Sequence, residues 1–208
     1  HWSAVTVALA RVPLAEAAVL TGQADYGVGN STLLLSRMAG KPVVVLAVVF
    51  QHSPSVLLMR QHGGAPDVHR LVGAPVMIGA ATDVAAASDE VSLFLQKMGV
   101  APQQMRHLPP SYRIGDLIDG KVDAIAAYST NEADYLDRAG FPYYQFTPRT
   151  AGIDFYGDNL FTSEYELRRH PERVKAFRAA SLRGWQYAMA HREEMARQGV
   201  ELPPAGEY

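Results

Sequence analysis

Three polar side chains, Gln51, His52 and Ser53, separate two apolar runs of the chain. The runs, residues 43–49 and 55–59, each have the length and β-branched content of a buried strand. A proline follows the polar residues, and because proline donates no backbone hydrogen bond, one continuous central strand is not expected there. The stretch therefore predicts a link between two lobes, with an amide, an imidazole and a hydroxyl group at the floor of a site between them. A hinge whose polar groups find partners within the protein is the structural alternative.

A second polar cluster follows the predicted strand at residues 25–28. Asn30 and Ser31 can cap the helix predicted at residues 32–38. The first N–H groups of a helix also attract polar or anionic ligand groups, so either residue could contact a ligand. Capping alone is the structural alternative, and the two roles are compatible.

A third cluster follows the predicted strand at residues 122–127. Tyr128 could stack on a flat heterocycle, while Asn131 and Glu132, next to Thr130, could hydrogen-bond the edge of such a ring. A helix cap with a glutamate in the first turn is the alternative.

Asp154, Tyr156 and Asp158 form a further polar and aromatic segment, which we interpret as the return link between the lobes. Turn chemistry beside the flanking glycines is the alternative interpretation. Metal binding by His52, His62 and His69 is not expected, because their spacing fits no ligand pair and no carboxylate accompanies them.

The elements that must position these residues alternate between strands and helices, which predicts a mostly parallel α/β sheet. Strands are expected at residues 5–8, 25–28, 43–49, 55–59, 75–79, 105–108, 122–127 and 143–146. Helices are expected at residues 13–20, 32–38, 85–98, 114–118, 131–138 and 164–169, and from residue 171 onward. The inner face of the last helix is expected to include Val174, Phe177, Leu182, Trp185 and Met189, with Trp185 in the core.

One pattern occurs twice. In residues 20–25 and again in residues 118–123, a helix ends at a glycine, an aspartate follows three residues later, and a strand begins. Both of these strands end in a polar cluster that can cap a helix. Because ligands sit beyond the carboxyl ends of strands in open α/β sheets, the two clusters are expected to face each other across a cleft.

Composition limits the classes of function. The formal net charge is −2, which gives no electrostatic drive toward nucleic acid, and the absence of cysteine excludes disulfides and thiolate chemistry. No apolar stretch of the sequence approaches the roughly 18–20 residues of a membrane span. Neither cofactor nor metal is expected.

The quoted residues carry a family resemblance. The segments that carry it are residues 22–25, 50–54, 130–132, 152–158 and 170–174. Together they resemble the periplasmic-binding-protein-like family of thiamine-pyrimidine synthases and alkanesulfonate- or nitrate-binding proteins, most closely its bacterial sensor-domain type. The resemblance implies a type II periplasmic-binding-protein-like fold of two α/β lobes. Residues 1–50 and 159–208 would form the first lobe, and residues 51–158 the second lobe with both crossovers.

The resemblance also implies an extracytoplasmic domain that closes on a small polar or heterocyclic ligand. Its partner would be a membrane permease or a membrane-attached signalling output domain. Binding of nucleic acid is not expected. Related domains begin with one more strand and helix, so the first lobe is expected to be incomplete.

A synthase of the thiamine pyrimidine is the alternative function that the family implies. A pyridoxal phosphate site needs a lysine Schiff base. The chain has four lysines, Lys41, Lys97, Lys121 and Lys175, and none of them is expected at the cleft. No nucleophile and base have recognisable spacing either, so binding without catalysis is expected.

Overall fold

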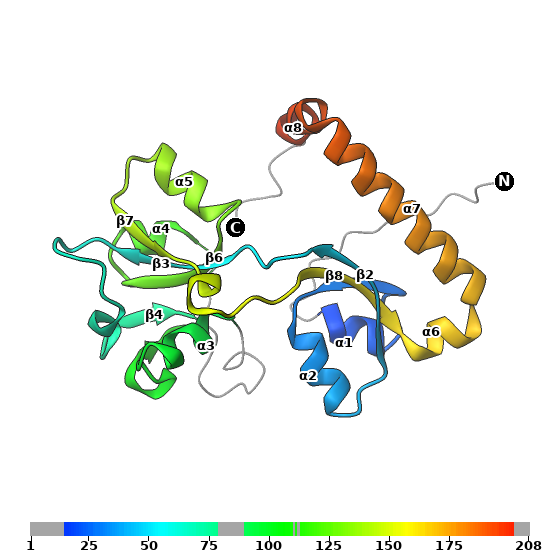
Figure 1. Ribbon diagram of the computed structural model, residues 1–208, viewed down its shortest axis with the longest axis horizontal. Helices are drawn as coiled ribbons and strands as arrows, with labels where there is room; N and C mark the ends of the chain where they lie inside the picture. The colour runs from blue at the N-terminus through cyan, green and yellow to red at the C-terminus, as the bar shows by residue number, and fades with distance from the viewer. Residues whose placement is uncertain (1–14, 79–89, 110, 112, 202–208) are drawn as a thin grey trace.

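The computed structural model describes residues 15–78, 90–109, 111 and 113–201, without the side chains of residues 199–201. The chain forms two lobes joined by two extended segments that run side by side (Figure 1). No helix in the described ranges is long and apolar enough to cross a membrane.

The first lobe is built on a three-stranded sheet with the order β1-β8-β2. Its strands are β1 (Tyr26–Gly29), β2 (Val43–Phe50) and β8 (Gly157–Ser163), and both pairs are antiparallel. The core joins Val19 of α1 (Ala15–Leu20) and Leu33 of α2 (Thr32–Met38) to Val43 and Phe161 of the sheet. α6 (Glu164–Arg169) and α7 (Pro171–Ala190) follow β8.

The second lobe is built on a five-stranded sheet with the order β5-β4-β6-β3-β7. Its strands are β3 (Ser55–Arg60), β4 (Pro75–Met77), β5 (Arg106–His107), β6 (Ala124–Tyr128) and β7 (Tyr143–Phe146). Its α-helices are α3 (Glu90–Lys97), α4 (Gly115–Ile118) and α5 (Glu132–Arg138). Short 3-10 helices lie at Val68–Leu71, Pro102–Gln104 and Pro148–Ala151.

The inner strand β3, which lies between β6 and β7, is buried on both faces. Leu57 and Met59 belong to a core that includes Phe94 of α3, whereas Val56 and Leu58 belong to the core on the opposite face. Successive side chains of a strand point to opposite faces, so a strand between two cores must be apolar at every position. This explains the unbroken apolar run that predicted a buried strand here.

The prediction of a mostly parallel sheet was wrong. β3 is antiparallel to both β6 and β7, and only the pairs that β4 forms with β5 and β6 are parallel. The link between β2 and β3 carries the chain from one sheet to the other, and a second link returns it to β8. The strand that follows each link, β3 or β8, is the one that runs antiparallel to its neighbours.

The expectation that the run at residues 43–49 is a buried strand was also wrong. Only Val43 of β2 is buried, and Val45 is 47% exposed. Since β2 is an edge strand that pairs with β8 alone, protein covers it incompletely along its length.

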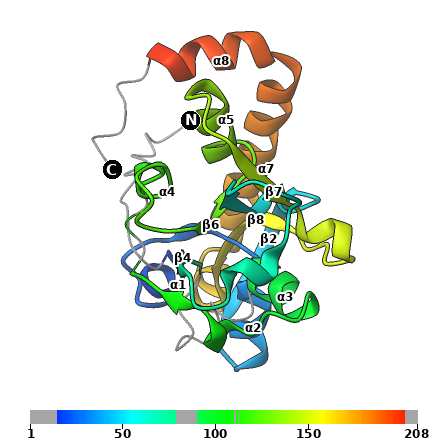
Figure 2. The ribbon, with the colours of Figure 1, turned by 90° about the vertical axis from the view of Figure 1, so that its left-hand side faces the viewer.

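The last long helix is less buried than predicted. Val174 is buried, and Phe177 stacks on Tyr26 with ring centroids 3.9 Å apart. Beyond these residues α7 contacts β2 at Arg178, whose Nε donates to the carbonyl of Leu46, and at Trp185, whose ring centroid lies 6.3 Å from that of Phe50. These contacts leave much of this part of α7 in solvent, and α8 (Arg192–Glu201) turns back from its end (Figures 1 and 2). Trp185 is therefore 46% exposed and Met189 58% exposed, which contradicts their assignment to the core.

The repeated pattern in the sequence is a repeat of structure. α1 ends before Gly22 and leads into β1 and α2, as α4 ends before Gly120 and leads into β6 and α5. Both glycines have positive φ, 74° and 77°, the conformation that ends a helix most easily with glycine. The predicted strand at residues 5–8, the start of the first predicted helix and the start of the helix at residues 85–98 lie outside the described residues.

Candidate functional site

The two crossovers between the lobes lie against each other. The amide of Ser53 in the first crossover donates a hydrogen bond to the carbonyl of Phe155 in the second, at 2.8 Å. Gly157, where β8 begins, sits so close that a Cβ there would lie 2.9 Å from Pro54 Cδ. Side chains from both crossovers are therefore brought together, although about a hundred residues separate them in the sequence.

A close pair of side chains joins the same two segments. His52 Nδ1 lies 2.9 Å and 3.0 Å from the two carboxylate oxygens of Asp154, and Arg149 Nε lies 3.5 Å from Asp154 Oδ1. The side chains of His52 and Asp154 are 54% and 42% exposed. An exposed pair of this kind contributes little to stability, and both of its side chains line a cavity beside the crossovers.

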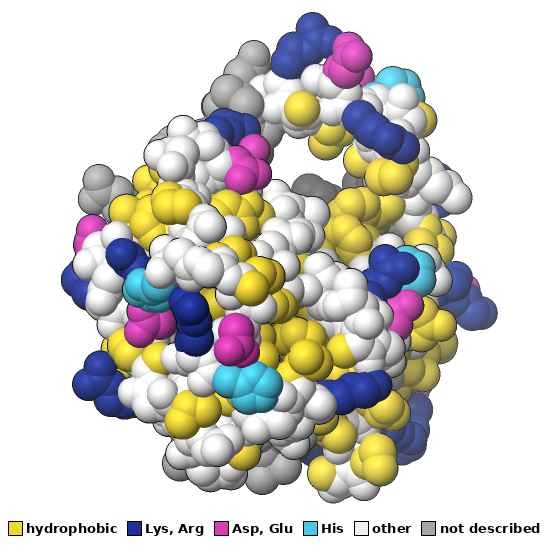
Figure 3. All heavy atoms as spheres, turned by 60° about the vertical axis from the view of Figure 1, so that its left-hand side comes forward, with side chains coloured by type: hydrophobic (Ala, Val, Ile, Leu, Met, Phe, Trp, Pro, Cys, Tyr) yellow, Lys and Arg dark blue, Asp and Glu magenta, His cyan; other side chains and the backbone are white. Residues whose placement is uncertain are grey.

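A cavity of about 930 Å³ opens beside the crossovers, on the side of α2 and β2. The apolar part of its wall on these two elements consists of Leu33, Leu34, Val43, Val44, Val45 and Val48, and Phe155 and Tyr156 add to it from the second crossover. In Figure 3 hydrophobic side chains gather in the middle of the face where the lobes meet, with charged side chains around them.

The polar part of the lining consists of Asn30, Ser31, Arg37, Gln51, His52, Asp154 and Asn159. Asn30 Oδ1 accepts hydrogen bonds from the backbone N–H of Thr32 at 3.0 Å and from its hydroxyl at 2.6 Å. Asn159 is 5% exposed, and its Nδ2 donates to the carbonyl of Gly29 at 3.3 Å. Within the described part of the chain, Asn30 Nδ2 and Asn159 Oδ1 keep no partner and are free to bind a ligand.

One side-chain contact spans the two lobes at the edge of this lining. Ser31 Oγ at the start of α2 donates a hydrogen bond to Glu90 Oε1 at the start of α3, at 3.3 Å. Although Ser31 is the first residue before α2, it makes no side-chain capping bond. Its hydroxyl therefore contacts the opposite lobe instead of its own helix.

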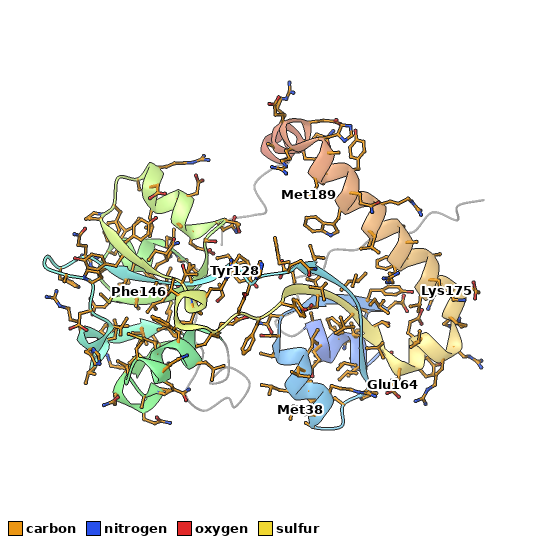
Figure 4. The ribbon with its side chains drawn as sticks, in the orientation of Figure 1. Met38, Tyr128, Phe146, Glu164, Lys175 and Met189 are labelled. Carbon is orange, nitrogen blue, oxygen red and sulfur yellow. The ribbon has the colours of Figure 1, made fainter. Side chains whose placement is uncertain are left out.

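A tyrosine and an aspartate meet on the other side of the crossovers. The hydroxyl of Tyr128, at the end of β6, donates to Asp158 Oδ1 at 3.5 Å, and Figure 4 places Tyr128 where the two lobes meet. Burial, followed by the negative charges of Asp158 and Glu90, raises the pKa of Tyr128 to about 12. Burial also raises the pKa of Asp158. The backbone of Asp158 has a positive φ of 44°.

The cavity brings together half of the residues that the sequence singled out: Asn30, Ser31, Gln51, His52, Asp154 and Tyr156. Ser53, Tyr128, Thr130, Asn131, Glu132 and Asp158 lie outside its lining. Glu132 turns back on its own lobe and accepts a hydrogen bond from the amide of Tyr128 at 2.9 Å. Asn131 precedes α5 without a side-chain capping bond.

Sequence reasoning missed Asn159 and the apolar wall. Asn159 lies opposite Val48 in the pairing of β2 and β8, and opposite Gly29 in the pairing of β1 and β8. This register, which the sequence does not contain, brings Asn159 beside Asn30. The valines of β2 were assigned to the core because their pattern is the same whether protein or a cavity covers them.

The statement that no carboxylate accompanies the three histidines was wrong. His52, His62 and His69 lie within hydrogen-bond distance of Asp154, Asp123 and Asp67, respectively. Each is a separate pair, and the described residues hold no group of three or more acidic or histidine side chains that could bind a metal ion.

None of the four lysines lines the cavity. Lys41 pairs with Glu16, Lys121 with Asp116 and Lys175 with Glu172, while Lys97 donates to the carbonyl of Ala151.

Comparison with known proteins relates this architecture to a family. Residues 8–195 match the family described as NMT1/THI5 like. A search of curated proteins found no match.

Solved structures share the fold at low sequence identity. The periplasmic aliphatic sulphonate binding protein SsuA from Escherichia coli is 16% identical, with a TM-score of 0.62 over 90% of this chain and 65% of that one. SsuA from Xanthomonas axonopodis pv. citri, an alkanesulfonate-binding protein bound to MOPS, is 17% identical, with a TM-score of 0.64 over 91% and 66%. A Candida albicans protein described as having the generic periplasmic binding protein fold is 15% identical, with a TM-score of 0.67 over 90% and 62%.

This chain therefore has the two-lobed periplasmic binding protein fold, as predicted, and it spans less than two thirds of the length of each of these three structures.

Proposed function

Because the chain belongs to the NMT1/THI5-like family, as its sequence resemblance predicted, we propose that it is a domain that binds a small molecule between its lobes. The observation that carries the proposal is the cavity of about 930 Å³ beside the crossovers, whose polar lining includes Gln51 and His52 of the first crossover and Asp154 of the second. Ligand pockets are typically concave, about 300–1,000 Å³ in volume and mostly apolar, with a few polar groups that orient the ligand. The cavity matches that description.

Binding is coupled to movement of the lobes about the crossovers. His52 and Asp154 sit on opposite crossovers and both line the cavity, so a ligand that contacts them also contacts the two segments that any rotation must bend. A ligand that interacts more favourably with the closed arrangement shifts the equilibrium toward it. The contact between Ser31 and Glu90 is available to report on that closure.

The domain acts outside the cytoplasm. Its closed form is recognised by a membrane permease, or its closure is transmitted to a membrane-attached signalling output domain. Support for the location comes from relatives of the same fold, since SsuA of Escherichia coli is a periplasmic binding protein. Support for binding without catalysis comes from the cavity lining, which includes no lysine that could form a Schiff base with pyridoxal phosphate.

Thermal unfolding of the full chain with a broad panel of small molecules tests the proposal. A ligand at a hundred times its Kd stabilises a protein by about 2.7 kcal/mol. In a domain of about 150–250 residues each kcal/mol raises Tm by roughly 2–4 °C, so we expect an increase of about 5–10 °C. A panel of sulfonates, amino acids, pyrimidines, amides and alcohols that produces no shift contradicts the proposal.

Two matched variants locate the binding site. Gln51 and Gln61 are both exposed glutamines that make no side-chain hydrogen bond within the described residues, but only Gln51 lines the cavity. Gln51→Ala is expected to weaken binding of whichever compound raises Tm, whereas Gln61→Ala leaves its affinity unchanged. Equal effects of both variants exclude this cavity as the site.

A further inference from the structure

We propose that the cavity accepts an uncharged, elongated aliphatic molecule with one polar head, an amide or a hydroxyl. This inference rests on the proposed binding function and names the class of ligand. It follows from three properties of the lining: the chemistry of its wall, the position of its polar groups and the pairing of its charges.

The wall on α2 and β2 is aliphatic. Two leucines of the helix face the cavity together with four valines of the strand, among which Val45 is 47% exposed and Leu34 is 66% exposed. The aliphatic side chains of this wall offer no aromatic face on which a heterocycle could stack, and the two aromatic side chains of the lining, Phe155 and Tyr156, belong to the second crossover. The aliphatic side chains do remove the methylene groups of a ligand from water, and this favours binding in proportion to the apolar area that is covered.

The polar groups lie at one end of this wall. α2 ends at Met38 and β2 begins at Val43, so a short loop joins them and their far ends are the start of α2 and the end of β2. Asn30 and Ser31 lie at the first of these ends, and Gln51 and His52 at the second. A ligand that places its head among these groups directs the rest of its length along the valines toward the loop.

The free hydrogen-bonding groups at the polar end suit an uncharged head. Asn30 offers its Nδ2 donor and Asn159 its Oδ1 acceptor, and the amide of Gln51 offers one group of each kind. An amide or a hydroxyl likewise carries both a donor and an acceptor, so it can satisfy both kinds of partner at once.

The charged side chains of the lining are paired. Arg37 is bonded to Glu164, while Asp154 lies between His52 and Arg149. A sulfonate or an ammonium head would therefore lose its hydration without meeting an unpaired opposite charge of the lining. The first three N–H groups of α2 are already bonded within the chain, those of Thr32 and Leu33 to Asn30 and that of Leu34 to the carbonyl of Ser31, so they do not offer an anion free donors.

Calorimetric titration of the full chain with a series of amides tests the inference. For butanamide, hexanamide and octanamide we expect the affinity to rise roughly ten-fold for each added pair of methylenes, close to the value for methylenes that become buried. Heptanesulfonate and heptylammonium, which carry a charged head on the same heptyl chain as octanamide, are expected to bind at least ten-fold more weakly than octanamide.

The outcomes separate this inference from the function on which it rests. Affinity that does not depend on chain length, or sulfonate binding as tight as amide binding, overturns the inference and leaves a binding domain. If neither an amide nor a straight-chain alcohol binds but another compound of the broad panel raises Tm, the inference alone fails. If nothing in either set binds, the proposed function fails as well.

A pair of valine variants tests the position of the aliphatic body. Val45→Thr places a hydroxyl in the wall, whereas Val28→Thr makes the same change at a similarly exposed strand residue, 55% exposed, that does not line the cavity. We expect Val45→Thr to weaken octanamide binding about ten-fold and butanamide binding much less, and Val28→Thr to change neither. Unchanged circular dichroism shows that both variants fold, and equal octanamide affinities of the two variants overturn the inference.

Discussion

Replacing Gly157 with alanine tests whether the close packing of the two crossovers holds the lobes together. A Cβ at this position would lie 2.9 Å from Pro54 Cδ, 3.1 Å from Ser53 Cα and 3.4 Å from Phe50 Cβ. The nearest of these atoms belongs to a proline ring and the next to the backbone, so neither can move aside as the end of a flexible side chain could. Because Gly157 does not have a positive φ, the effect of the substitution is steric.

The size of the effect follows from the cost of overpacking. Adding a methyl group to a filled site costs about 1–3 kcal/mol. For a domain of about 150–250 residues this lowers Tm by roughly 2–12 °C. The displaced segments also carry Gln51, His52 and Asp154, so we expect weaker ligand binding in the same variant.

Calorimetric unfolding and amide hydrogen exchange measure the two consequences. The amide of Ser53 should exchange faster in Gly157→Ala, because its 2.8 Å bond to the carbonyl of Phe155 crosses the site of the clash. Gly115→Ala is the matched control, since a Cβ there has no neighbour within 4 Å. An equal Tm in the two variants, with unchanged protection of Ser53, would refute the argument that the crossovers are packed at their limit.

Three further predictions concern stability and pH. Gly27→Ala places a Cβ 2.6 Å from the buried ring of Phe161, and we expect a loss of about 1–3 kcal/mol in chemical denaturation; a loss no larger than that of Gly115→Ala contradicts this packing. His52→Ala should change the free energy of unfolding by less than about 1 kcal/mol because the pair with Asp154 is exposed, while it weakens ligand binding; a large loss of stability with normal binding reverses the assignment. Burial is the main cause, and the negative charge of Glu166 the second, that raises the pKa of Tyr26 from 10.0 to about 12. Between these two pH values the folded state keeps a proton that the unfolded state loses, so the free energy of unfolding falls as the pH rises through this interval. Tyr26→Phe should make that alkaline fall shallower in urea unfolding at graded pH, and an identical slope argues against the shift.

Local patterns in the sequence predicted those parts of the fold that depend on neighbouring residues. The glycines that end α1 and α4 and the repeated helix–strand–helix unit are examples, because each depends on a few adjacent positions. The alternation of strands and helices did not predict the direction of the strands. β3 pairs with β6 and β7, which lie far along the chain, and no local pattern shows that these pairs are antiparallel.

The same limit applies to the candidate site. The polar residues that follow strands were identified, but His52 and Asp154 are 102 residues apart and only the fold pairs them. The spacing of hydrophobic residues identified the apolar face of α7, but it does not tell how far along the helix this face is covered by protein. Trp185 was therefore assigned to the core, although it is 46% exposed.

The order of strands in the first lobe sets the order in which the chain can fold during synthesis. β8 lies between β1 and β2, so these two strands have no common partner until residue 163 has been made. The five strands of the second lobe, in contrast, all lie between residues 55 and 146 and can pair first. We therefore expect the second lobe to fold during synthesis, before the central strand of the first lobe has been made. The binding cavity would then be the last part of the molecule to form. Hydrogen exchange on a fragment that ends before β8 should show protection in the second lobe alone, and protection of β1 or β2 in that fragment would contradict this order.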